Sequence, residues 1–220
     1  MQQHVFAISQ TCNQLGIKHA VICPGSRSAP LVFAFTQNKN LSCISIIDER
    51  SAAFITLGMA KQLQQPVVLI CTSGTAALNF YPAIAEAFYQ KVPLIVLTAD
   101  RPPEFLNQQD GQMITQKNVF DKNILASFEL PCYVQGKENL QETSKIISKA
   151  IGISNGVIKG PVHINVPLSE PLYPSNQKIA AITQLRNYTT TNPTIIKSSN
   201  QQGLERKQKE AHYYWRITQK

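Results

Sequence analysis

The chain has 220 residues, with 21 lysines and arginines against 13 aspartates and glutamates, a formal net charge of +8. A hydrophobic content of 43 % is enough for a packed core and excludes a disordered chain. The charge does not indicate a nucleic-acid partner, because residues 1–175 hold 13 basic and 11 acidic groups, whereas residues 176–220 hold 8 basic and 2 acidic ones. We therefore expect one nearly neutral domain over 1–175. A basic polar tail over 176–220 would be a linker or the stub of a missing central domain.

Cysteine usage and hydropathy bear on the compartment. The five cysteines are widely spaced and none forms a C-x-x-C pair, which favours buried free thiols in a reducing compartment over a disulfide framework. No apolar stretch approaches the ~18 residues that a membrane span needs. The first residues lack the basic region of a signal peptide. These features predict a cytoplasmic protein with no membrane partner.

Apolar patterns predict strands that alternate with helices along the chain. The strands are continuous Val/Ile/Leu runs without polar alternation, as in strands that are covered on both faces. The fold class expected is therefore α/β, a parallel sheet with helices on both faces and right-handed crossovers. In order, the predicted elements are helix 5–15, strand 19–23, loop 24–28, helix 29–37, strand 42–48, helix 49–64, strand 66–72, helix 73–90 with a kink at Pro82, strand 92–100, extended loop 101–112, helix 138–154 and strand 160–167.

Polar segments follow four of the predicted strands. Ligands of open parallel sheets bind beyond the carboxyl ends of the strands, so these segments are the candidate site. Neither G-x-x-x-x-G-K-[ST] nor G-x-G-x-x-G occurs, which disfavours a Walker-type ATPase and a dinucleotide site. No His, Cys or carboxylate cluster has metal-ligand spacing, so no metal site is predicted, and His163 inside a strand suggests a packing role. The four segments are PGSRS (24–28), DER (48–50), TSGT (72–75) and ADRPPE (99–104).

The first acidic candidate is Glu49, which stands at a strand-to-helix junction. One interpretation is helix capping, with Asp48 as N-cap and Glu49 in a first turn that favours acids. The other is a carboxyl group held at the sheet edge as a proton partner for a ligand. The residue pattern leaves both interpretations open.

Two further features suggest anion binding. Ser73-Gly74-Thr75 opens a helix whose free backbone N–H groups would suit a polar or anionic ligand, or the segment is an N-cap with close packing through Gly74. Arg27 and Arg101 each follow a predicted strand; each is either solvated or part of a fork-like site for carboxylates.

Together these segments resemble the amino-terminal domain of the 2-succinyl-5-enolpyruvyl-6-hydroxy-3-cyclohexene-1-carboxylate synthases. These are thiamine-diphosphate-dependent transferases of menaquinone biosynthesis. The resemblance runs from about residue 1 to Tyr173, and it is the set of motifs that makes it specific. The motifs are CPGSRSAP (23–30), DERSAAFITLGMAK (48–61), CTSGTAALNFYPAIAEA (71–87), VPLIVLTADRPPE (92–104), Gln112 and HINVPLSEPLY (163–173).

The resemblance implies a pyrimidine-binding domain for thiamine diphosphate. Glu49 matches the family's glutamate that hydrogen-bonds the pyrimidine ring and would be the catalytic residue. It implies decarboxylation of 2-oxoglutarate and transfer of the succinyl-semialdehyde unit to isochorismate. Thr72, Ser73 and Gly74 would lie near the cofactor, and the matching substrate-side positions are Ser26, Arg27, Arg101 and Gln112.

The sequence also departs from the family. Family members are longer, with a diphosphate-binding domain that holds magnesium or manganese through a G-D-G motif, and no G-D-G occurs here. The resemblance therefore implies half of a site that another subunit completes in a homodimer or homotetramer, and no activity of the chain alone. Two alternatives stay open: another thiamine-diphosphate enzyme of the acetolactate synthase type, and a non-catalytic domain for anion binding or assembly.

Overall fold

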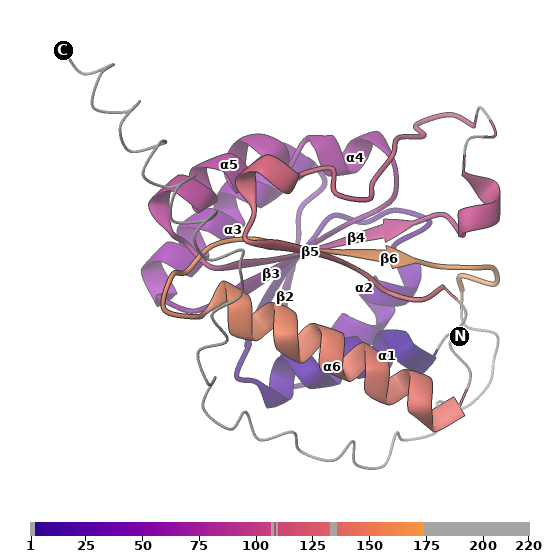
Figure 1. Ribbon diagram of the computed structural model, residues 1–220, viewed down its shortest axis with the longest axis horizontal. Helices are drawn as coiled ribbons and strands as arrows, with labels where there is room; N and C mark the ends of the chain where they lie inside the picture. Colours follow the sequence, from indigo (N-terminus) through magenta and orange to yellow (C-terminus); the bar gives the residue numbers. More distant parts are fainter. Residues whose placement is uncertain (1–2, 107, 109, 133–135, 174–220) are drawn as a thin grey trace, which may run out of the picture. The chain divides into compact units, whose positions relative to one another are not determined.

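The computed structural model describes residues 3–106, 108, 110–132 and 136–173. These residues form a six-stranded sheet in which paired strands are parallel, in the order β2-β1-β3-β4-β6-β5 (Figure 1). The predicted α/β class with a parallel sheet is confirmed. The elements are α1 Gln3–Gln14, β1 His19–Ile22, α2 Ala29–Thr36, β2 Ser42–Ser45, α3 Glu49–Leu63, β3 Val67–Cys71, α4 Thr75–Leu78, α5 Tyr81–Gln90, β4 Leu94–Asp100, β5 Ala126–Glu129, α6 Gly136–Ser154 and β6 Val162–Pro167, with 3-10 turns η1 Pro103–Phe105 and η2 Asp121–Asn123.

Helices cover both faces of the sheet. Figure 1 shows α1, α2 and α6 on one side and α3, α4 and α5 on the other. Alternation along β4 separates two cores: Ile95 and Leu97 pack on the α1 side, and Leu94 and Val96 pack on the α3 side. Every residue of β3 and β4 is buried, which explains their unbroken apolar sequences.

The strand order reverses at β1. β2 pairs with one side of β1 and β3 with the other. The strands that follow β1 are therefore added to the sheet on both of its sides. The carboxyl ends of β1 and β3 therefore form the topological switch point at which open α/β sheets bind ligands. The predicted polar segments would meet at this edge of the sheet.

The sequence patterns missed one strand, Ala126–Glu129. This short strand pairs with β6 at the edge of the sheet and is only half-buried. Its Ser and Glu interrupt the apolar run that identified the other strands. A polar edge strand lacks the hydrophobic signal of a strand that is covered on both faces.

Most predicted boundaries differ from the structure by one or two residues, and three elements differ more. The helix expected over 73–90 is two helices, α4 and α5, and Pro82 lies in the first turn of the second, where its missing N–H costs no helical hydrogen bond. The strand expected over 42–48 ends at Ser45. The loop expected to be extended over 101–112 contains the 3-10 turn η1. None of these differences changes the order in which the predicted elements follow one another.

Two further predictions concern the cysteine thiols and the carboxy-terminal tail. All five cysteines are free thiols, four of them buried and Cys43 half-buried, which confirms the expectation of buried thiols. Residues 174–220 lie outside the described residues. The domain division into 1–175 and 176–220 therefore stays a prediction.

Candidate functional site

The loops after β1 and β3 contact each other at the switch point. A Cβ atom added to Gly25 would lie 2.4 Å from Cβ of Thr72. The two loops therefore approach each other so closely that only glycine fits at position 25. Thr72 is half-buried and Ser73 is buried. Ser26, next to Gly25, is exposed at the same loop. This contact joins the segment predicted to face the substrate to the segment predicted to face the cofactor.

Glu49 is the first residue of α3, and its neighbour Asp48 caps that helix. The Asp48 carboxylate accepts a hydrogen bond of 2.7 Å from Ser51 N, which confirms that Asp48 is the N-cap. Glu49 is half-buried, and within the described part of the chain no hydrogen bond or ion pair engages its carboxylate. The capping role therefore belongs to Asp48, and a role of the Glu49 carboxylate toward a ligand stays a prediction.

Two buried thiols lie close to Glu49. Burial, with a smaller contribution from the nearby carboxylates of Glu49 and Asp48, raises the pKa of the Cys23 thiol to about 12. Burial, Cys23 and Glu49 also hold the pKa of the Cys71 thiol well above its usual range. Glu49 begins α3, whose Ala52 and Ala53 pack in one core with Cys23 after β1 and Cys71 at the end of β3, so the start of this helix lies at the β1–β3 switch point. Both thiols stay protonated and act as packing groups.

The turn at Gly74 depends on glycine. Gly74 has φ +84°, and a Cβ atom there would lie 2.0 Å from the carbonyl oxygen of Gln112. Gly74 N donates to Gln116 Oε1 at 2.6 Å, and Thr75 N donates to Gln112 O at 3.0 Å. The expectation of free N–H groups for an anion is therefore wrong for these two residues, and the alternative of close packing through Gly74 is what the structure contains. The side chain of Gln112 is exposed.

The two arginines are mostly buried. Arg27 Nη1 donates to Leu168 O at 3.0 Å and lies 3.4 Å from Glu170 Oε1, and the Arg27 side chain is 22 % exposed. Leu168 N in turn donates to Asp100 O at 3.0 Å. Arg27 therefore reaches the end of β6, beside the residue that precedes Arg101.

Arg101 contacts the loop that follows it. Its Nη2 donates to Gly111 O at 2.9 Å, and its Nε lies 3.6 Å from Asp110 Oδ2. The Arg101 side chain is 15 % exposed, whereas Asp110 is 54 % exposed. The interpretation of merely solvated arginines is wrong for both side chains, because each is mostly buried and bonded to the protein. A single ligand that binds both arginines stays a prediction.

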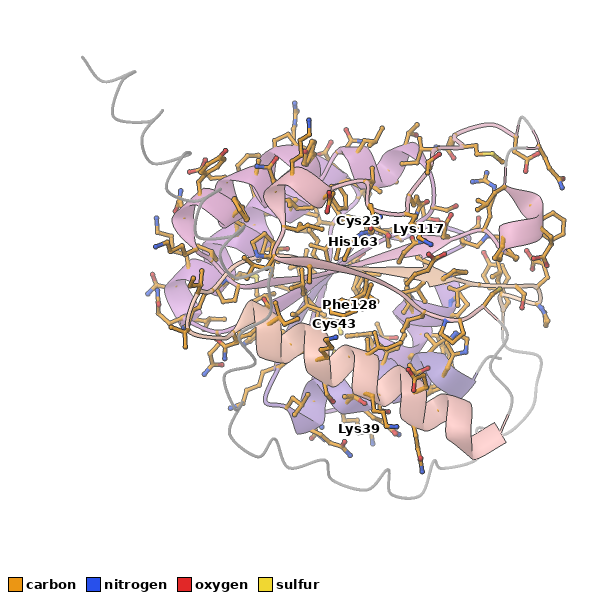
Figure 2. The ribbon with its side chains drawn as sticks, viewed as in Figure 1. Cys23, Lys39, Cys43, Lys117, Phe128 and His163 are labelled. Atoms are coloured by element: carbon orange, nitrogen blue, oxygen red, sulfur yellow. The ribbon has the colours of Figure 1, made fainter. Side chains whose placement is uncertain are left out.

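Sequence patterns missed a buried polar network on the α3 side of the sheet. Alternation places Thr98 and Asp100 of β4 and His163 and Asn165 of β6 on this face, and Gln116 covers them. Figure 2 shows His163 next to the sheet on this side. The signal was the i, i+2 spacing of the two polar residues within an apolar strand; Gln116, in a loop, offered none.

Burial shifts two ionisable groups of this network. His163 is fully buried, and burial lowers its pKa to about 3. Its ring packs edge-on against Phe120 at 5.0 Å between centroids, which confirms the predicted packing role. Burial also raises the pKa of Asp100, although hydrogen bonds from Asn165 and from Arg101 N oppose this shift.

Among the described residues, no group of three or more His, Cys, Asp or Glu side chains could hold a metal ion. Of the helices that the structure describes, none has the length and apolar character to cross a bilayer.

Comparison with known proteins places the chain in a family. Residues 4–122 match the family model described as thiamine pyrophosphate enzyme, N-terminal TPP binding domain. Proteins named 2-succinyl-5-enolpyruvyl-6-hydroxy-3-cyclohexene-1-carboxylate synthase are similar: one from Desulfotalea psychrophila (48 % identity; 78 % of this chain, 32 % of the relative), one from Cytophaga hutchinsonii (49 %; 80 % and 31 %) and one from Flavobacterium psychrophilum (48 %; 86 % and 33 %).

The matches cover most of this chain but only part of each relative. It spans about a third of the length of the curated relatives it matches. The family model covers α1 to η2, and so it includes Glu49 and the polar segments that follow β1, β3 and β4. The parallel sheet and its switch point agree with this assignment. The chain belongs to the family of N-terminal TPP-binding domains of thiamine pyrophosphate enzymes.

Proposed function

We propose that this chain forms the pyrimidine-side wall of a thiamine diphosphate site in a menaquinone-pathway synthase. The reaction would decarboxylate 2-oxoglutarate and transfer the succinyl-semialdehyde unit to isochorismate. The observation that carries the proposal is the half-buried carboxylate of Glu49 at the β1–β3 switch point, without a hydrogen-bond partner among the described residues. The names of the similar proteins support the choice of reaction.

The residues at the switch point suit the pyrimidine ring of the cofactor. Glu49 would hydrogen-bond a ring nitrogen and exchange a proton with it, and its half-burial limits competition from water. Thr72, Ser73 and Gly74 would line the ring, because their loop closes the same edge. Bound there, thiamine diphosphate supplies the stabilisation of a carbanion on the substrate carbon.

The substrate side would be formed by Ser26, Arg27, Arg101 and Gln112. Both proposed substrates are dicarboxylates, and a guanidinium group binds a carboxylate through two parallel hydrogen bonds. Each arginine already has an exposed carboxylate beside it, Glu170 or Asp110. A substrate carboxylate would replace these partners at little cost, because exposed ion pairs contribute little free energy.

The remaining parts of the site would come from sequence outside this chain. A magnesium or manganese ion would bind with the cofactor's diphosphate in a further domain, and the full-length protein would be a homodimer or homotetramer. Exposed apolar side chains near Glu49 support such assembly: Ile44 (40 %), Ile47 (86 %), Phe54 (45 %) and Ile55 (43 %). A full-length protein that sediments as a monomer would contradict this part. A cytoplasmic location stays a prediction from the sequence.

Two other functions make different predictions. An enzyme of the acetolactate synthase type would prefer pyruvate, which has one carboxylate and no use for a second arginine. A non-catalytic domain would bind an anion without turnover in any context. The presence of two arginine side chains at one edge of the sheet favours a dicarboxylate substrate.

The test uses a hybrid in which residues 1–173 replace the matching segment of the Flavobacterium psychrophilum relative. With thiamine diphosphate and magnesium, we expect the hybrid to decarboxylate 2-oxoglutarate in preference to pyruvate, and the 220-residue chain alone to be inactive. Glu49→Gln should lower the hybrid's rate by at least about 100-fold, because it removes the proton-exchanging carboxyl group.

Two variants serve as controls. Asp48→Ala removes the helix cap and should lower stability while the rate stays near normal. Glu86→Gln makes the same acid-to-amide change on the exposed side of α5 and should change neither quantity. A near-normal rate for Glu49→Gln, or turnover by the isolated chain, would contradict the proposal.

A further inference from the structure

The buried polar network at the carboxyl ends of β4 and β6 satisfies every hydrogen-bonding group at its centre. Asn165 Oδ1 accepts from Thr98 Oγ1 at 3.1 Å and from Gln116 Nε2 at 3.0 Å, and Asn165 Nδ2 donates to Asp100 Oδ2 at 2.8 Å. Because the Thr98 hydroxyl proton is used for Asn165, His163 Nε2 must donate to Thr98 Oγ1, 2.7 Å away. The direction of each bond is therefore determined by its neighbours.

Gln116 joins three segments of the chain through this network. Its Nε2 donates to Ala99 O of β4 and to Asn165 Oδ1 of β6, both at 3.0 Å, and its Oε1 accepts from Gly74 N at 2.6 Å. Both amide protons and the amide oxygen are used, and the side chain is 2 % exposed. The amide therefore has one orientation, in which its oxygen points at Gly74.

This orientation fixes the turn that separates two predicted sets of site residues. Gly74 closes the loop after β3, and Gln112 lies directly against it, with the Gln112 carbonyl oxygen accepting from Thr75 N at 3.0 Å. Gly74 (φ +84°) and Gln112 (φ +62°) both have a positive φ, which glycine adopts readily and glutamine only where its surroundings hold it. The hydrogen bond from Thr75 N holds the Gln112 carbonyl against the turn, and the buried hydrogen bond from Gly74 N to Gln116 holds the turn itself.

We propose that Gln116 is a positioning residue that holds the Thr72–Gly74 loop in register with the substrate-side segment around Gln112. Naming these segments cofactor-side and substrate-side rests on the proposed function, whereas the hold on Gly74 does not. Gln116 lies behind the site, buried by the network, and acts through the backbone of Gly74.

Hydrogen exchange of single amides in the full 220-residue chain tests the proposal. Gln116→Met keeps the side-chain length and removes all three hydrogen bonds. We expect the protection of the Gly74 amide to fall by about tenfold relative to that of Leu69 inside β3, the effect of one buried hydrogen bond. Ser154→Ala is the matched control, because Ser154 is also fully buried and contacts Leu94 O and Gly160 O away from this edge. It should leave the ratio of Gly74 to Leu69 protection within about twofold.

Gln116→Glu allows a second measurement, the pH dependence of Gly74 protection, which a general loss of stability would not change. Protonated, the introduced carboxyl group accepts from Gly74 N and donates to Ala99 O or Asn165 Oδ1. Ionised, it has no proton to donate and is repelled by both of these acceptor oxygens, which moves it away from the position that binds Gly74 N. Burial beside acceptors raises the pKa of such a group. The Gly74-to-Leu69 ratio should therefore match that of the unsubstituted chain at pH 5 and fall below it at pH 8. The same ratio at both pH values, or an unchanged ratio in Gln116→Met, would overturn the proposal.

The hybrid separates this proposal from the proposed function. In active hybrid protein, Gln116→Met should raise the half-saturating concentration of thiamine diphosphate by about tenfold and the KM for 2-oxoglutarate by less. An equal rise in both would count against selective positioning of the cofactor-side loop. If the unsubstituted hybrid is inactive, the proposed function fails, and Gly74 exchange alone still decides the role of Gln116.

Discussion

The loop at Gly74 and the two arginines lie at the same edge of the sheet but are held in different ways. The loop is fixed by a buried hydrogen bond from Gly74 N to Gln116 Oε1 and by a backbone hydrogen bond from Thr75 N to Gln112 O. Arg27 and Arg101 instead contact carbonyl oxygens and the exposed carboxylates of Glu170 and Asp110.

The difference follows from the cost of breaking each contact. A buried donor that loses its partner keeps its full desolvation penalty, whereas water and salt replace an exposed carboxylate easily. The Gly74 loop is therefore a preformed surface, and the arginines are groups that can exchange partners. A wall for an aromatic ring needs the first property, and a site that admits charged substrates needs the second.

The largest expected loss of stability comes from Gly74→Ala, which disturbs the preformed Gly74 loop. The added Cβ would lie 2.0 Å from the Gln112 carbonyl oxygen, and φ is +84°. Backbone strain and overpacking together should lower the free energy of unfolding by roughly 3 kcal/mol. Urea denaturation of the purified chain measures this loss.

Gly58→Ala is the matched control for that substitution. Gly58 lies inside α3 and an added Cβ has no heavy atom within 4 Å. Alanine there should raise the free energy of unfolding by up to about 1 kcal/mol, because it favours the helix. If the two substitutions changed stability alike, the close packing at Gly74 would not be what holds the loop.

An intermediate effect comes from acid, which acts on the network at His163. Its pKa is lowered by burial from 6.5 to about 3, so its contribution to stability is complete above pH 6.5 and is lost as the pH falls toward 3. Between pH 7 and pH 5 the unsubstituted chain should lose about 2 kcal/mol more than His163→Gln, which cannot be protonated. Urea denaturation at the two pH values gives the difference.

The second buried histidine, His4, cancels in that comparison, because both proteins contain it. His19→Gln is the control, since His19 is only half-buried at the amino end of β1. It should show the same pH dependence as the unsubstituted chain. Parallel curves for all the proteins would mean that His163 becomes protonated without disturbing the network.

The smallest change in stability is expected at the arginines, whose exposed carboxylate partners can be replaced. Glu170→Gln removes the charge beside Arg27, but Glu170 is 69 % exposed, so the free energy of unfolding should change by less than about 0.5 kcal/mol. Glu129→Gln, which breaks the exposed pair with Lys117, should behave alike. Urea denaturation at 0.1 M and 0.5 M NaCl provides the measurement, and a loss above about 1 kcal/mol at either site would remove the distinction between the two sides.

The order of the elements and the place of the site could be predicted from local patterns. Continuous apolar runs such as Val67–Cys71 identify strands that are covered on both faces, and polar segments after them must lie at one edge of a parallel sheet. Asp48 was recognisable as an N-cap because capping is decided within one helical turn. The edge strand Ala126–Glu129 was not recognisable, because a half-buried polar strand has no such local signal.

Sequence by itself determined the α/β class, the family motifs and the residue types at the sheet edge, since these depend on short-range periodicity and composition. Only the tertiary structure decided which donors are free. Gly74 N and Thr75 N are engaged by residues about 40 positions away, and Arg27 by Leu168, 141 positions away. Such contacts depend on strand order and loop packing, and no local pattern encodes them. For this reason the sequence indicated a candidate site, and the fold showed that Gln116 is buried behind Gly74.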